Sequence, residues 1–264
     1  MMSRPDAAPD GLPATTAALP RPTVRFSVWL AGRIDYEAYL KLAERLAWEA
    51  SEPEGRGPTL LLCEHADVIT MGRLASRRDV QLTDDELARR GLRLRFVGRG
   101  GGAVLHTTGQ VAVSLFARLT DLGLGEHDVA AYVDRFEGGL AAAVAAMKCR
   151  ARRMPGVPGV FGSSGQLAAL GIAVRRGVVS HGGFLNVATP TDLARKVRTT
   201  SEGSMGSIEA DRRRRAAPAE ARSLIVQQLA LAFNAEVVSL QSGIPGDFVA
   251  SRPRSPHPAS RHVG

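Results

Sequence analysis

Cysteine and lysine are both scarce in this sequence. The chain of 264 residues contains two cysteines, Cys63 and Cys149, and three lysines, Lys41, Lys148 and Lys196. Two cysteines are too few for the disulfide framework of a small secreted protein, and they suit a reducing compartment as buried thiols. Because lysine is rare, nearly all of the positive charge behind the net charge of +8 comes from arginine.

Long apolar runs and interleaved aromatic residues are also missing. No stretch approaches the roughly 18 consecutive apolar residues of a membrane-spanning helix, and residues 1–22 lack the apolar core of a signal peptide. Aromatic residues make up 5% of the chain and do not alternate with the arginines, as a single-strand binder requires. The histidines and cysteines show no metal-ligand spacing. We therefore expect a cytoplasmic protein with no membrane span, no bound metal and no nucleic-acid partner.

What is present is the composition of a soluble globular domain, with 44% hydrophobic and 23% charged residues. Residues 1–22 and 251–264 are polar and rich in proline, so we expect two disordered tails. No linker or repeat divides the chain between them. One domain over residues 23–250 is the expected organisation.

Hydrophobic periodicity predicts an α/β (α+β) fold in which a mixed sheet is flanked by helices. Thr83, with Glu86 three residues later, forms a capping box that marks one helix start. Arg175-Arg176-Gly177 predicts the turn of a hairpin. The expected strands cover residues 24–30, 59–63, 92–97, 111–116, 167–174 and 178–180, and the expected helices residues 35–50, 83–90, 128–147 and 219–233.

A glycine-rich run, residues 98–102, lies between two of the expected strands. Glycines allow a ligand to approach the main chain, and Arg99 can pair with a carboxylate or phosphate through its planar fork. The run is neither a P-loop nor a dinucleotide fingerprint, because it lacks G-K-[ST] and no helix follows it directly. By itself it fits a ligand cradle and a flexible loop with a buried histidine equally well.

Four segments, in order along the chain, match the motifs of one known family. They are Glu64-His65 with Thr70-Met71-Gly72-Arg73 (E-H-x-x-x-x-T-x-G-R), Arg99-Gly100-Gly101 with His106 and Gly109-Gln110 (R-G-G-x-x-x-x-H-x-x-G-Q), Leu167-Ala168-Ala169-Leu170-Gly171 (I-A-A-I-G), and Ser180-His181-Gly182 with Leu185-Asn186-Val187 (S-H-G-x-x-L-N-V). The sequence resembles the lipoyl(octanoyl) transferase family over roughly residues 24–240.

This resemblance implies a biotin/lipoate protein ligase-like fold. It implies transfer of an octanoyl group from acyl carrier protein to a lysine of a lipoyl domain, which is the step of protein lipoylation. In the family a cysteine carries the acyl group as a thioester, and a lysine lowers the pKa of that thiol. A thiolate is the nucleophilic form, and a nearby cation stabilises it. The implied partners are therefore octanoyl-loaded acyl carrier protein and lipoyl domains, and no cofactor is expected.

The sequence departs from the family at both catalytic positions. The family lysine immediately precedes I-A-A-I-G, and Gln166 stands there. The family cysteine follows L-N-V, yet no cysteine follows Cys149 anywhere in the chain. In addition, Val104 replaces a threonine of the glycine-rich motif, Thr107-Thr108 replaces Gly-Pro, and Gly98 replaces an acidic residue.

Other side chains are candidates for the missing nucleophile. Thr199, Thr200 and Ser201 lie in the segment of the family cysteine, but a hydroxyl needs a base, and Gln166 cannot act as one. Lys196 is a candidate base if it turns inward. Cys63 is either a second candidate nucleophile or a small apolar residue of a buried strand.

The resemblance also predicts which residues contact the acyl chain. They are Arg99, Gly100, Gly101, Gly102, Ala103, Val104, Leu105 and His106, Ala169, Leu170 and Gly171, and Gly182, Gly183 and Phe184. His181 is assigned a similar role, and His65 is left open between a pocket role and a structural one. The run 212–215 of four arginines fits a solvated turn or a contact with an acidic carrier protein.

Two main hypotheses follow from the sequence. In the first, the chain is an acyltransferase that uses Thr199, Thr200 or Ser201 as nucleophile. In the second, it is a pseudo-transferase, which binds acyl chains, carrier domains or a partner enzyme without turnover. A ligase that activates a free acid with ATP is disfavoured, because the lysine and a phosphate loop are both absent.

Overall fold

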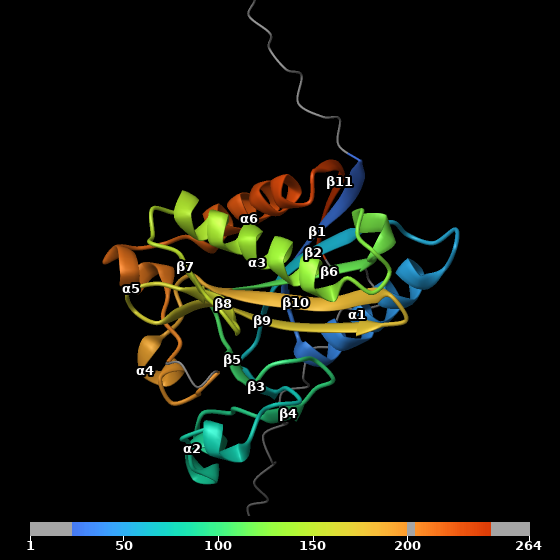
Figure 1. Cartoon of the computed structure of the whole chain (residues 1–264). Helices are drawn as coiled ribbons and strands as arrows, with labels where there is room; N and C mark the ends of the chain where they lie inside the picture. Colours follow the sequence, from blue (N-terminus) through green and yellow to red (C-terminus); the bar gives the residue numbers. More distant parts are fainter. Residues whose placement is uncertain (1–22, 200–203, 244–264) are drawn as a thin grey trace, which may run out of the picture.

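A computed structural model describes residues 23–199 and 204–243, and an eight-stranded mixed sheet forms its centre (Figure 1). The strand order is β11-β1-β2-β6-β10-β9-β8-β7. β1 is parallel to β2 and β11, and the remaining neighbours are antiparallel. The strands are β1 (Val24–Ile34), β2 (Thr59–His65), β6 (Gln110–Arg118), β7 (Arg152–Met154), β8 (Val157–Phe161), β9 (Gln166–Arg175), β10 (Val178–Asn186) and β11 (Ala235–Ser242).

Helices cover both faces of this sheet. α3 (Val129–Ala146) and α6 (Pro218–Ala232) pack on one face, and α1 (Tyr36–Ser51) packs on the other (Figure 1). The alternation of side chains along a strand divides β2 between the two layers. Leu60 and Leu62 join the core under α3 and α6, whereas Leu61 and Cys63 join the core under α1.

A three-stranded sheet in the order β4-β3-β5 forms a smaller layer below the main sheet in Figure 1. Its strands are β3 (Val68–Met71), β4 (Leu94–Phe96) and β5 (Ala103–His106). It shares an apolar core with α2 (Asp84–Arg89) and α4 (Thr191–Ala194). The remaining short helices are η1 (Arg77–Asp79), η2 (Thr120–Leu122) and α5 (Ile208–Arg212). The glycine-rich run connects β4 to β5 within this small layer, and it contacts β9 of the large sheet, where the Gly100 N–H donates to Ile172 O at 3.0 Å.

The predicted mixed sheet with flanking helices is confirmed, and so are two local signals. Thr83 caps α2 through the predicted capping box with Glu86, and the turn at Arg176-Gly177 joins β9 to β10, with both residues at positive φ. The two expected tails, residues 1–22 and 251–264, lie outside the described residues. No helix of the described ranges is long and apolar enough to cross a membrane.

Candidate functional site

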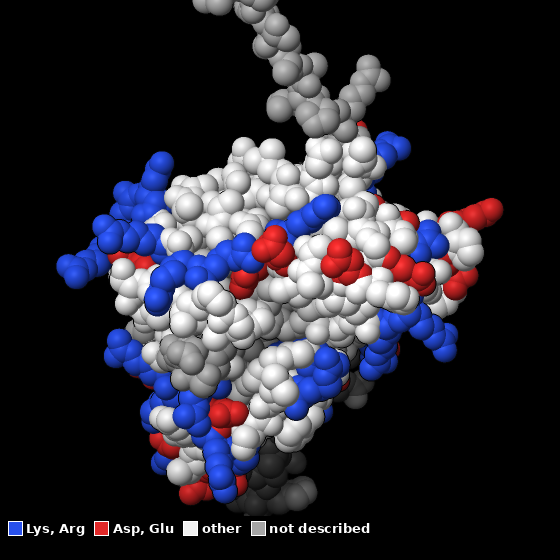
Figure 2. Space-filling view, viewed as in Figure 1, with Lys and Arg blue, Asp and Glu red and all other residues white. Residues whose placement is uncertain are grey.

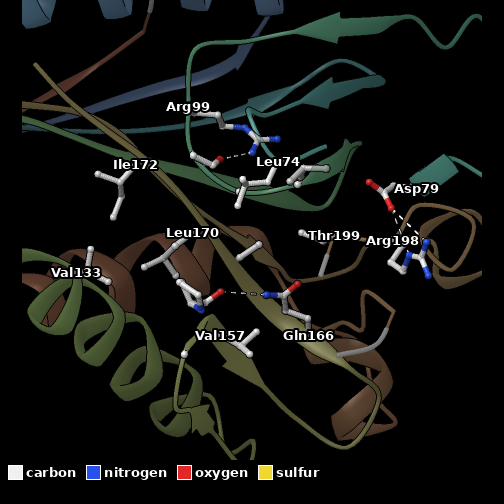
Figure 3. A pocket seen from close by; sticks show the side chains of 17 residues that line it. Leu74, Asp79, Arg99, Val133, Val157, Gln166, Leu170, Ile172, Arg198 and Thr199 are labelled. Atoms are coloured by element: carbon white, nitrogen blue, oxygen red, sulfur yellow. Dashed lines mark hydrogen bonds and ion pairs between the residues drawn. The ribbon is translucent and has the colours of Figure 1, made fainter. Parts of the chain in front are cut away.

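A cavity of ≈ 680 Å³ lies between the glycine-rich run and β9 (Figure 3). Apolar atoms form the larger part of its surface, and five of the residues that line it carry polar or charged side chains, a mixture that suits a small-molecule site. The residues that line it are Leu74, Asp79, Arg99, Gly100, Gly101, Gly102, Val104, Val133, Gly156, Val157, Pro158, Gln166, Ala169, Leu170, Ile172, Arg198 and Thr199.

Arg99 is buried at one wall of this cavity, with 1% of its surface exposed. Two motif glycines make room for it, because a Cβ at Gly171 would lie 2.7 Å from Arg99 Cδ and one at Gly72 would lie 2.8 Å from Nη1. No carboxylate pairs with Arg99 in the described part of the chain. Burial lowers the pKa of the Arg99 guanidinium to about 10, so the group remains a cation at neutral pH.

The guanidinium of Arg99 begins a chain of buried hydrogen bonds. Its Nη2 donates to Thr70 Oγ1 at 2.7 Å, and that hydroxyl lies 3.0 Å from His106 Nε2. Gln110 Nε2 donates to Leu105 O and Asn186 Oδ1, so Gln110 Oε1 accepts from His106 Nδ1–H, and the unprotonated Nε2 accepts the proton of the Thr70 hydroxyl. The proton of the imidazole is therefore on Nδ1, and burial holds the pKa of His106 well below its ordinary value.

The same chain continues to the first residue of β9. His106 Nδ1 donates to Gln110 Oε1 at 2.8 Å, and Gln110 Nε2 donates to Asn186 Oδ1 at 2.8 Å. Asn186 Nδ2 then donates to the main-chain oxygen of Gln166 at 3.1 Å. Each donor and acceptor role fixes the next, so the glycine-rich motif and Gln166 are held by one directional network.

Gln166 lies with its side chain inside the cavity wall and 1% of its surface exposed. Its main chain is fixed on both sides, because its N–H donates to Ser204 O and its carbonyl accepts from Gly206 N, both at 3.0 Å. Its side-chain Nε2 donates to Pro158 O at 3.4 Å. Its Oε1 has no hydrogen-bond partner among the described residues, and in Figure 3 this oxygen turns toward the side where Thr199 lies.

Thr199 lines the cavity at the end of a segment that packs against η1. Val197 pairs with Val80, and the Arg198 side chain contacts Asp79 Oδ1 at 3.3 Å (Figure 3). The Thr199 hydroxyl is buried and has no partner within the described ranges. Thr200 and Ser201, the other two candidate nucleophiles, lie outside the described residues.

A buried carboxylate holds the opposite wall in place. Glu137 on α3 accepts from the main-chain N–H of Gly159 at 2.5 Å and from Arg153 Nε at 2.6 Å. These bonds tie β7 and β8 to α3, so that Gly156 in the turn between the two strands and the first residues of β8, Val157 and Pro158, line the cavity. The sequence motifs gave no sign of these residues, or of Val133 and Leu74, because their contribution depends on tertiary packing.

None of the cysteines or lysines lines the cavity, and all five lie in the described part of the chain. Cys63 is buried under α1, where burial raises the pKa of its thiol. Cys149 is buried near Ile208 and its thiol pKa is raised in the same way. Lys196 turns outward and pairs with Glu86 at 3.1 Å, so it does not supply a base to the cavity.

Seven residues expected to contact an acyl chain are not among those that line the cavity. They are Ala103, Leu105, His106, Gly171, Gly182, Gly183 and Phe184. Gly182 and Gly183 instead lie under α3, where a Cβ would meet Phe136 at 3.0 Å and Leu140 at 3.1 Å respectively. Phe184 packs behind the site, with its ring 5.7 Å from the Arg99 guanidinium carbon. These side chains support the lining from behind.

The other motif histidines also lie away from this cavity. His65 is buried against Tyr36 and Tyr39, and burial lowers its pKa to about 4. His181, at positive φ, lines a second hollow beside α1, and burial lowers its pKa to about 4 as well. Their low pKa values keep both imidazoles neutral at pH 7, because burial disfavours the charged form.

Positive charge is spread over the surface in separate groups (Figure 2). One group lies over α5, where Arg213, Arg214 and Arg215 are exposed. Arg212 differs from them, because only 9% of its side chain is exposed and it lies 3.6 Å from Glu220. Across the described residues, no group of three or more His, Cys, Asp or Glu side chains is arranged to hold a metal ion.

Comparison with solved structures places this architecture among the lipoate protein ligases. The chain superposes on a bi-partite lipoate protein ligase from Thermoplasma acidophilum, whose study included its E2 lipoyl domain, with a TM-score of 0.63. The match has 16% sequence identity and covers 84% of this chain and 88% of that one. At this identity the likeness establishes the fold.

Sequence comparison establishes the family. The chain is 36% identical over 159 residues to an octanoyltransferase of Solibacter usitatus, covering 60% of this chain and 70% of that protein. An octanoyltransferase of Koribacter versatilis is 29% identical over 249 residues, or 88% of this chain and 97% of the relative. The family described as "Lipoyl protein ligase A/B catalytic domain" matches residues 35–229. The chain belongs to this family and is an octanoyltransferase-like protein.

Proposed function

We propose that this protein binds a medium-length acyl group in the cavity beside Arg99 and Gln166 and does not form an acyl-thioester intermediate. The acyl class follows from the octanoyltransferase relatives. The cavity supports it with a lining that is mostly apolar, including Val133, Leu170 and Ile172. In this proposal the protein is a pseudo-transferase, which keeps the acyl-binding site and lacks the thiol and the amine that transfer requires.

One observation carries the proposal: the cavity contains neither a thiol nor an amine. The sequence extends this statement to the undescribed residues, because residues 1–22, 200–203 and 244–264 contain no cysteine and no lysine. The charged groups of the lining are Asp79, Arg99 and Arg198, and Asp79 is already paired with Arg198. A transferase needs a nucleophile within reach of a base, and the described lining offers the Thr199 hydroxyl without one.

Each group of the site has a role in binding under this proposal. Apolar side chains of β9 and α3 remove the acyl chain from water, which contributes about 0.8 kcal/mol per buried CH₂. Arg99 provides a fixed positive charge beside the polar end of the ligand. The partner that presents the acyl group is a lipoyl domain or an acyl carrier protein, by analogy with the octanoyltransferase relatives and the lipoate ligase neighbour.

Two measurements test this proposal together. Calorimetric titration with octanoate and with an octanoyl-lysine peptide is expected to give saturable binding, and Leu170→Asp is expected to abolish it. Incubation with octanoyl-carrier protein and a lipoyl domain is expected to leave the mass of the lipoyl domain unchanged. Transfer of octanoyl to the domain would contradict the proposal, and loss of that transfer in Thr199→Val would identify the threonine as the nucleophile.

A further inference from the structure

Three buried polar atoms without a hydrogen-bond partner belong to residues that line the same cavity. They are Gln166 Oε1, Thr199 Oγ1 and Arg99 Nε, each without a partner in the described ranges. A buried polar group that remains unpaired costs about 1–3 kcal/mol, so native proteins retain few of them. Their convergence on one cavity indicates a ligand that supplies the missing partners.

Gln166 is the most selective of the three groups because its orientation is fixed. The donation from Nε2 to Pro158 O identifies the opposite atom of the amide as the oxygen. The bonds from Ser204 and Gly206 prevent the main chain at this position from turning. The free Oε1 is an acceptor only, and it requires a ligand atom that carries a hydrogen.

We propose that this cavity recognises an acyl group in amide linkage, as on the side chain of an acylated lysine, in preference to a thioester. This inference rests on the proposed acyl-binding function and specifies its ligand. The amide N–H is donated to Gln166 Oε1, and the amide carbonyl accepts from the Thr199 hydroxyl or from Arg99 Nε–H. An acylated lysine is the product that the sequence resemblance implies, so under this proposal the site retains a product.

The other forms of the acyl group leave Gln166 unpaired. A thioester has a sulfur and a carbonyl, and a carboxylate has two oxygens, so neither carries a hydrogen at the reacting end. The Thr199 hydroxyl and Arg99 Nε do not discriminate between an amide and a thioester, since the carbonyl of either accepts from them. An ammonium group at position 166 would reverse the preference, because a lysine donates and does not accept. Replacement by glutamine therefore changes which linkage the site matches.

Burial strengthens this selection. Gln166 and Thr199 are 1% and 7% exposed, so water does not compensate their free polar atoms. A ligand reaches them through a small displacement of the Thr199 segment, toward which the Gln166 oxygen points (Figure 3). In a site closed to water, one matched hydrogen bond distinguishes an amide from its ester by about five- to tenfold in affinity.

A pair of peptides that differ in one atom tests the inference. One carries Nε-octanoyl-lysine, and in the other the amide N–H is replaced by an ester oxygen. Calorimetric titration of the full chain is expected to show about five- to tenfold tighter binding of the amide. In Gln166→Met, which keeps the length of the side chain and removes the acceptor, the two peptides are expected to bind equally. Thr199→Val is expected to weaken both peptides by the same factor.

The outcomes separate this inference from the function on which it rests. If both peptides bind the unmodified chain equally, the amide preference is wrong and acyl binding stands. If neither peptide nor octanoate binds, the proposed function itself fails. A preference that persists in Gln166→Met would remove Gln166 as its cause. The comparison in the unmodified chain decides the preference even if a variant does not fold, and an unacylated lysine peptide controls for contacts with the peptide alone.

Discussion

The main-chain oxygen of Thr199 lies 2.4 Å from the position that a Cβ on Gly102 would occupy. Only a glycine at position 102 allows this approach. Through it, the segment that ends at Thr199 closes against the glycine-rich run. This contact explains why a glycine is required at the end of the run. A side chain at this position would displace the Thr199 segment and change the shape of the cavity.

Gly102→Ala is therefore expected to displace the Thr199 segment. A Cβ that meets a main-chain oxygen cannot be relieved by a side-chain rotation, so we expect a destabilisation of about 1–3 kcal/mol together with weaker binding of octanoyl ligands. Urea unfolding and ligand titration measure the two effects. Gly98→Ala is the matched control, because its Cβ would meet only Arg175 Nη2 at 3.5 Å. Equal effects of both substitutions would contradict this account.

The Thr70 hydroxyl connects Arg99 to His106, and its removal tests the hydrogen-bond chain. Thr70→Val leaves Arg99 Nη2 and His106 Nε2 each without the partner described above. We expect a loss of about 2–4 kcal/mol in the free energy of unfolding, because two buried groups lose a bond. Thr70→Ser keeps the hydroxyl and is expected to lose less than half as much. A serine variant as unstable as the valine variant would show that the methyl group, and not the hydrogen bond, matters.

Because the buried histidines are neutral, we expect the free energy of unfolding to fall in mild acid. The pKa values of His65 and His181 are lowered to about 4 by burial, whereas an unfolded histidine titrates near 6.5. As the pH falls from about 6.5 to about 4, the unfolded state binds protons that the folded state does not, so folding weakens. His65 alone contributes on the order of 3 kcal/mol across this window. Urea unfolding at constant ionic strength measures the slope, and a flat profile between these pH values would refute the assignment.

The two thiols are expected to be inert in the folded chain. Cys63 is 2% exposed and Cys149 is 9% exposed, and burial raises both pKa values. A disulfide reagent such as Ellman's reagent is expected to modify them at the rate of unfolding, and rapidly in urea. Cys63→Ala is expected to leave the binding of octanoyl ligands unchanged. Fast modification of Cys63 in native buffer, blocked by octanoate, would instead place this thiol at the site.

The elements that the sequence predicts are those whose signal is local. The capping box at Thr83 and the turn at Arg176-Gly177 involve neighbouring residues, and the amphipathic pattern of residues 35–50 matches α1 to within one residue at each end. The sequence did not predict β3, β5 and β8, because these strands have weaker local patterns. β3 and β5 are four residues long and completely buried, so they show no alternation, and β8 contains a proline and a glycine.

The candidate site was predicted in part for a similar reason. The motifs located Arg99, the glycine-rich run and Gln166, because these residues are fixed by close approaches that restrict their type. They also suggested Gly182 and Gly183 as lining residues, although these glycines accommodate α3. A small residue in a motif can make room for a ligand or for a helix, and only the tertiary arrangement distinguishes the two.

The mass of the protein itself after incubation with an octanoyl thioester tests the central claim most directly. An unchanged mass is expected, because none of the cysteines and lysines lines the cavity. The double variant Gln166→Lys, Thr199→Cys places an amine and a thiol in the cavity and serves as the control in which an adduct is expected. A covalently octanoylated side chain in the unmodified chain, lost on addition of octanoate as competitor, would contradict the account.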